Sequence, residues 1–129
     1  MKLKSNVIST FKLVFSDNFS ELKDLITTEN IDLEDKEQFL NILERYRYVK
    51  ENDLASIKAV LKNWKLERLS LIDKSILFFS IAKIKYLNFP PNKTISEAIE
   101  LARMFSEKKS PKFINGVLDA WYNNYKGEA

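Results

Sequence analysis

The chain has 129 residues, of which 45% are hydrophobic and 30% charged, and its 21 basic and 18 acidic side chains give a formal net charge of +3. This length suits one domain, spanning residues 1–129, that can bury a single core without covalent staples. Because the chain contains neither cysteine nor histidine, its composition excludes disulfides, thiolate zinc sites, cysteine nucleophiles and a Ser–His–Asp triad.

The location that this composition favours is the cytoplasm, since the lack of cysteine fits a reducing compartment. Residues 1–6 contain no continuous apolar core of the kind that a secretion signal needs. The longest mainly apolar run, residues 76–82, is far too short to span a bilayer. We therefore expect no association with membranes.

Charge is segregated along the chain. Residues 17–44 hold nine acidic side chains and two lysines, whereas residues 1–15 hold three lysines and no acid, and residues 45–129 hold sixteen basic and nine acidic side chains. A molecule with an acidic flank and basic ends is able to orient on a polyanion. Ordinary solvated helix faces explain the same pattern, and both interpretations stay open here.

Apolar residues at spacings of three to four positions predict helices through the N-terminal half. The first helix is expected over residues 3–15, and a short second helix over residues 19–26 precedes a polar loop over residues 27–35. Asp35 and Gln38 resemble a capping box for a third helix that carries Phe39 to Tyr46. A fourth helix is expected from Leu54 to Trp64, with Asn52 or Asp53 as its cap.

The C-terminal half predicts three further helices. The fifth, residues 69–87, is apolar on nearly all sides, which places it in the middle of a bundle, and it ends before Pro90 and Pro91. Thr94 and Glu97 form a capping box for the sixth helix, and Ser110 is the expected N-cap of the seventh, which we expect to fray at residues 126–129. The fold class is therefore all-α, with about seven helices.

Binding chemistry is better represented than catalytic chemistry. The carboxylates cluster in the acidic flank, the two glycines are isolated, and no phosphate loop is present, so we expect no enzyme activity, no metal and no cofactor. Lys108, Lys109 and Lys112 surround a predicted helix N-terminus beside Phe113, a combination suited to the phosphates and an unstacked base of single-stranded RNA. The alternative is that Phe113 belongs to the core and the lysines only add solubility.

Two neighbours in the seventh helix carry alternatives of their own. Gly116 lies inside a helix, where glycine costs about 1 kcal/mol relative to alanine. Close packing against a bulky residue such as Trp64 or Phe79 is the favoured explanation, and backbone approach to a ligand is the other. Asn115 is able to bond a base edge or to cap a neighbouring loop.

Three motifs in order give the chain a family resemblance. Residues 64–77 contain Trp64, Arg68 and Asp73 at characteristic spacing, Pro90-Pro91 leads into a helix ending Glu100-Leu101-Ala102, and residues 110–119 read Ser-Pro-Lys-Phe-Ile-Asn-Gly-Val-Leu-Asp. Together with their separations, these motifs resemble the NusB family of bacterial antitermination factors over about residues 61–119. The N-terminal half matches only weakly.

The resemblance implies an all-α fold of two packed helical subdomains without enzyme activity. It implies assembly with the ribosomal protein NusE on single-stranded boxA RNA, in support of processive transcription of ribosomal RNA operons. The RNA-binding residues that follow, from the basic segments and the resemblance together, are Lys2, Lys4, Lys108, Lys109, Lys112, Phe113 and Asn115. The partner-binding residues are Phe78, Ala82, Lys83, Tyr86 and Asp119.

Departures from the family pattern weaken the functional expectation more than the fold. The family's N-terminal arginines are reduced to two lysines, which lack the bidentate fork of arginine. Phe78 replaces a basic residue, Ala82 a tyrosine, and Lys83 a glutamate of the partner face, a charge reversal that would repel a basic protein. The alternative function is a NusB-like protein-interaction domain with weakened or lost RNA binding, using an exposed Phe78. For either function the chain is expected to be a monomer or a homodimer, because an apolar patch around Phe78 could equally be a homodimer contact.

Overall fold

The computed structural model describes residues 3–16 and 33–128. Every regular element within these ranges is helical, which confirms the predicted all-α class. The elements are α1 (Ser5–Ser16), α3 (Leu33–Asn52), α4 (Leu54–Lys58), the 3-10 turn η1 (Leu66–Arg68), α5 (Leu71–Ile81), the π-helical turn η2 (Ala82–Tyr86), α6 (Pro91–Phe105) and α7 (Ser110–Glu128).

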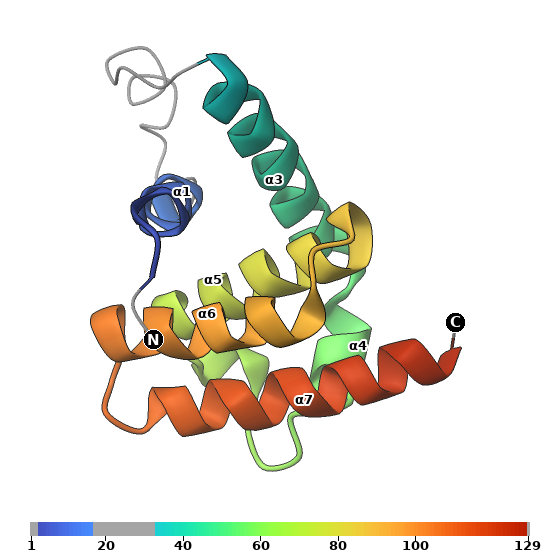
Figure 1. The fold of residues 1–129 in the computed structure, drawn as a ribbon. Coiled ribbons are helices and arrows are strands. Elements are labelled where there is room, and N and C mark those ends of the chain that lie inside the picture. The colour runs from blue at the N-terminus through green and yellow to red at the C-terminus, as the bar shows by residue number, and fades with distance from the viewer. Residues whose placement is uncertain (1–2, 17–32, 129) are drawn as a thin grey trace.

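Helix α5 lies at the centre of the bundle. It contacts α1, α3, α6 and α7, with α1 and α3 on one side and α7 on the other (Figure 1). Ile76, Leu77, Phe79 and Ile81 face different directions around its axis, and all are almost completely buried. The central position predicted from the all-round apolar pattern is therefore confirmed.

Helices α6 and α7 form an antiparallel hairpin packed along α5 (Figure 1). The chain reverses between them over residues 106–109, where the Ser106 N–H donates to the Ala102 carbonyl and the Ser110 N–H donates to the Glu107 carbonyl. Leu101 from α6 and Leu118 from α7 are fully buried within the hairpin's apolar face. The start of α7 is thus set by the end of α6.

A buried carboxylate ties this reversal to the first turn of α5. Asp73 accepts hydrogen bonds from the Ser106 hydroxyl at 2.6 Å and from the Ser110 hydroxyl at 3.0 Å. The backbone N–H of Asp73 donates in turn to the Ser70 hydroxyl, which caps α5. One residue therefore connects the start of α5, the end of α6 and the start of α7.

Several predicted helix caps are wrong, and at Ser110 and Asp53 the reason is that tertiary partners bind the side chains instead. Ser110 begins α7 but its hydroxyl donates to Asp73. The Asp53 carboxylate accepts from the Lys85 ammonium at 2.5 Å and from the Tyr86 hydroxyl at 2.7 Å, and it does not cap α4. Helix α6 starts at Pro91, so Thr94 lies inside it with a buried hydroxyl that has no hydrogen-bond partner.

The predicted boundaries differ from the structure at three further places. Helix α3 begins at Leu33, so Asp35 lies inside it and is not its cap. Helix α4 ends at Lys58, and Trp64 lies in the loop that follows, because the chain turns after one and a half turns of helix. Helix α7 continues to Glu128 without the expected fraying. The short helix predicted over residues 19–26 falls outside the described residues.

Lys83 is a buried cation in η2. It is 3% exposed, its ammonium lies 3.8 Å from the Glu97 carboxylate, and it sits over the Phe79 ring at 4.3 Å from the centroid. Burial lowers the pKa of Lys83 to about 8, against the opposing attraction of Glu97. The pairing explains why Glu97 does not complete the predicted capping box.

The Asp73 hydrogen bonds should be visible in stability. We expect Asp73→Ala to lower the free energy of unfolding by about 2 to 3 kcal/mol, because the buried Ser110 hydroxyl and the half-buried Ser106 hydroxyl lose their acceptor. Urea denaturation followed by helical circular dichroism measures this. Glu107→Ala, an exposed acid in the same reversal, is the matched control and should change stability by less than about 0.5 kcal/mol. An equally small effect for both variants would contradict the role of Asp73.

The buried Lys83 predicts a pH dependence of stability. Its pKa is about 8 in the folded chain and the ordinary 10.5 when unfolded, so the unfolded state binds more protons between these values. The free energy of unfolding should therefore rise from pH 8 to 10.5 by on the order of 2 kcal/mol. This rise is measured relative to the double variant Lys83→Met with Glu97→Gln, which lacks both charges. A difference between the two proteins that stays flat or falls with pH would refute this.

Candidate nucleic-acid interface

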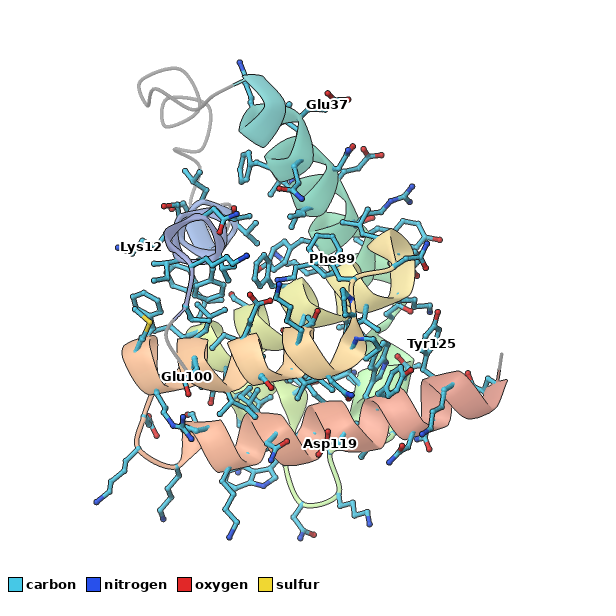
Figure 2. All side chains as sticks on the ribbon, viewed as in Figure 1. Lys12, Glu37, Phe89, Glu100, Asp119 and Tyr125 are labelled. Atoms are coloured by element: carbon cyan, nitrogen blue, oxygen red, sulfur yellow. The ribbon has the colours of Figure 1, made fainter. Side chains whose placement is uncertain are left out.

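The basic residues predicted around the start of α7 lie together in the structure. Lys108 and Lys109 form the reversal after α6, and Lys112 lies on the first turn of α7, all three exposed. Figure 2 shows side chains ending in nitrogen that extend into solvent around this reversal and the first half of α7. The N-terminal N–H groups and the dipole of α7 add to the positive potential.

An open hollow of about 530 Å³ adjoins these lysines. Arg103, Lys108, Lys112 and Asn115 line it, together with Glu107 and uncharged neighbours. Arg103 was not predicted from the sequence; its guanidinium pairs with Glu100 one turn earlier on α6. A basic residue in the last turn before a tight reversal lies beside the next helix, and that spacing would have identified it.

The charges in this region are largely unneutralised. In residues 3–16 and 33–128, no salt bridge involves Lys108, Lys109 or Lys112. Glu107 is the acidic residue that lines the hollow. The hollow therefore presents a surplus of cations, as a site for a phosphate backbone requires.

Phe113 is half-buried and packs against the core, so neither sequence interpretation describes it completely. Its ring and that of Trp64 meet edge to face, with centroids 5.6 Å apart and planes at 68°. Trp64 is 60% exposed, although its spacing placed it on a buried helix face. The more accessible ring at this site is thus Trp64.

Lys4 does not join this cluster. Lys2 lies outside the described residues. Lys4 lines a separate hollow of about 330 Å³ with Lys93 and Pro90, at the N-terminal end of α6. On α6 this hollow is lined by residues up to Glu97, and the larger one by Ile99 and Arg103, so the two occupy successive stretches of the helix.

Three of the five predicted partner-binding residues are buried. Phe78 is 6% exposed and packs against Tyr46, and Ala82 and Lys83 are buried in the same region. The expectation of an exposed Phe78 is wrong, because the all-round apolar α5 is enclosed by its neighbours. The charge of Lys83 faces Glu97 inside the protein and is not presented to a partner.

The other two predicted partner-binding residues are more accessible. Tyr86 is half-buried, donates to Asp53 and meets the exposed Tyr48 ring at 5.2 Å between centroids. Asp119 is exposed near the middle of α7 (Figure 2). These two remain able to contact another molecule directly.

Gly116 has no close-packed neighbour. A β-carbon built at this position meets nothing within 4 Å, so the predicted packing against Trp64 or Phe79 is wrong. Gly116 lies on the exposed side of α7, as does Asn115, which lines the larger hollow. Most of the acidic flank at residues 17–44 falls outside the described residues; within it, Glu37 and Glu44 are exposed on α3.

Residues 3–16 and 33–128 include no helix that is both long and apolar enough to cross a bilayer. Within the same ranges, no three or more side chains of His, Cys, Asp or Glu lie close enough together to hold a metal ion.

Known proteins resemble this chain in sequence. Three relatives carry the name transcription antitermination protein NusB. That of Bacillus cereus (strain ATCC 10987 / NRS 248) is 41% identical over 103 residues, covering 76% of this chain and 78% of the relative. Those of Bacillus mycoides and Chloroherpeton thalassium are 50% and 48% identical over 70 and 67 residues, about half of this chain, and the matches span only 54% and 32% of the relatives' own lengths.

The fold also matches solved structures. T. maritima NusB superimposes with a TM-score of 0.81 at 26% identity over the full length of both chains. A chain from the crystal structure of a plectonemic RNA supercoil gives 0.82 over 96% of both chains, at 20% identity, which is a likeness of fold alone. The model of the NusB family matches residues 4–123, nearly the whole sequence. The chain therefore belongs to the NusB family.

Proposed function

We propose that the chain is an RNA-binding transcription antitermination factor that pairs with the ribosomal protein NusE on boxA RNA and promotes processive transcription of ribosomal RNA operons. The observation that carries the proposal is the group of exposed cations at the start of α7, Lys108, Lys109 and Lys112, beside a hollow that Asn115 lines. Family membership and relatives named as antitermination proteins support the same function.

Lysines and a helix N-terminus suit phosphates, and the amide of Asn115 suits the edge of an unpaired base. No covalent step is needed for this function, and we propose that the protein acts by binding alone. A cytoplasmic location follows from the same proposal, because the nascent RNA and the ribosomal protein meet there.

The burial of Lys83 removes one objection to a basic partner. An exposed lysine in place of a glutamate would repel such a protein, but this ammonium is 3% exposed and lies 3.8 Å from Glu97. The accessible residues that we propose for partner contact are Tyr86 and Asp119. No observation favours the alternative of an interaction domain without RNA binding.

The direct test is assembly of a ternary complex. We expect the chain, the NusE of its own host and boxA RNA to form one complex by gel shift, with the RNA bound more tightly when NusE is present, because both proteins then contribute contacts to one strand. A scrambled RNA of the same length is the control. Failure to form an RNA-dependent complex at low salt would rule the proposal out.

A charge reversal at the centre of the cluster tests the RNA site. Lys112→Glu should weaken RNA binding roughly tenfold and reduce the slope of log affinity against log salt by about one or more, because a phosphate loses its cation. Fluorescence anisotropy at several salt concentrations measures both quantities.

The matched control for this variant is Lys126→Glu, an exposed lysine on the same helix. It lies 14 residues from Lys112, or about 20 Å along α7. Its affinity and salt slope should equal those of the wild type. If the two variants weaken binding equally, the effect is one of net charge, and the site at the start of α7 is wrong.

A further inference from the structure

Trp64 is the most exposed of the large hydrophobic side chains in the described part of the chain, at 60%. Tryptophan is usually highly buried, so this exposure needs an explanation. Trp64 lies in the loop between α4 and η1, which runs beside α7 in Figure 1. It is not a loose side chain, because its ring contacts that of Phe113, which packs against the core.

The surroundings of Trp64 are basic. Lys62 and Lys65 flank it in the loop and are exposed, and Arg68 and Lys109 line a small hollow of about 160 Å³ beside it. Glu67, the acidic residue of this loop region, pairs with Lys58 at 3.6 Å. No salt bridge in residues 3–16 and 33–128 involves the four cations. Asp73 and Glu107 also line the small hollow, and the Asp73 carboxylate is engaged by Ser106 and Ser110. With Lys62 and Lys65 in the loop, cations outnumber carboxylates around the indole.

This hollow continues the interface proposed above. Lys108 and Lys112 line the larger hollow on one side of the first turn of α7, and Lys109 and Phe113 line the smaller one on the other side. Glu107 lines both, so the two hollows adjoin at the reversal. A strand that crosses the start of α7 would pass directly from the lysines to Trp64.

We propose that Trp64 is a stacking platform for one unpaired base of single-stranded RNA, with Lys62, Lys65 and Lys109 holding the neighbouring phosphates. Cations around an accessible aromatic ring favour a nucleic acid over an apolar protein segment, because the ring stacks on any base while the charges pair with the backbone. Phe113 contacts the indole and packs against the core, so it holds Trp64 in place and is not itself the stacking surface. The inference rests on the proposed RNA-binding function and adds a site to it.

The intrinsic fluorescence of the chain provides a direct measurement. The sequence contains two tryptophans, and the other, Trp121, is 2% exposed within the core. A base that stacks on Trp64 should therefore quench the solvent-exposed part of the emission. The probes are single-stranded RNA of about 12 nucleotides, a length within the range of known single-strand sites, and inorganic polyphosphate, which has the charge without bases.

Trp64→Ala should weaken binding of the RNA roughly tenfold or more and leave binding of polyphosphate unchanged. Trp64→Phe, which keeps an aromatic face, should recover most of the loss. Tyr48→Ala removes another exposed aromatic side chain, on α3, and should bind RNA as the wild type does. Because Trp64 and Tyr48 are both exposed, all three variants should keep the wild-type melting temperature within a few degrees.

Failure of this inference is distinguishable from failure of the proposed function. If Lys112→Glu weakens RNA binding while Trp64→Ala does not and RNA leaves the emission unchanged, the platform is wrong and the function stands. Equal losses for RNA and polyphosphate, or a loss only of NusE binding, would also overturn the platform, the latter assigning Trp64 to a protein contact. If the wild type binds no RNA even with NusE, both proposals fall.

Discussion

The position of the proposed RNA site depends on the buried carboxylate of Asp73. Its two oxygens accept from Ser106 and Ser110, which bracket the reversal between α6 and α7, while its own backbone N–H completes the cap at Ser70. The three lysines of the site lie in or next to that reversal, and none of them takes part in these bonds. The polar interactions that hold the backbone are therefore separate from the charges left for a ligand, and the lysines remain accessible without loss of stability.

The same separation explains which parts of the fold could be predicted. Apolar periodicity identified α1, α5, α6 and α7, because burial of one face or of the whole helix is a property of the local sequence. Helix caps predicted from local sequence spacing are mostly wrong. Ser110 binds Asp73, Asp53 binds Lys85 and Tyr86, and Glu97 binds Lys83. Each partner lies 14 or more residues away along the chain. A polar side chain near a helix end takes the partner that is buried with it, and spacing along the chain does not show that partner.

Residues of the candidate site were predictable to different degrees. Lys108, Lys109 and Lys112 are adjacent in sequence, so their grouping needed only the start of one helix. Arg103 lies beside these lysines because α6 and α7 form a hairpin. Trp64 reaches the site from a loop nearly fifty residues upstream of Phe113. Local sequence patterns reveal neither contact. Trp64 was assigned to a helix because its spacing from Leu61 and Val60 fits one. The helix ends instead at Lys58, and the loop turns the indole outward.

Buried and exposed cations have opposite roles in this chain. Lys83 is enclosed by Phe79, Phe89 and Glu97; burial lowers its pKa to about 8, and the attraction of Glu97 opposes this only in part. The lysines around α7 are exposed and available to a partner, although salt screens their attraction. Electrostatics of that kind brings a polyanion to the surface without choosing its sequence or fixing its register. Selectivity for single-stranded RNA over other polyanions must then come from the uncharged groups beside the lysines, and the structure supplies the amide of Asn115 and the ring of Trp64 in two hollows that share Glu107.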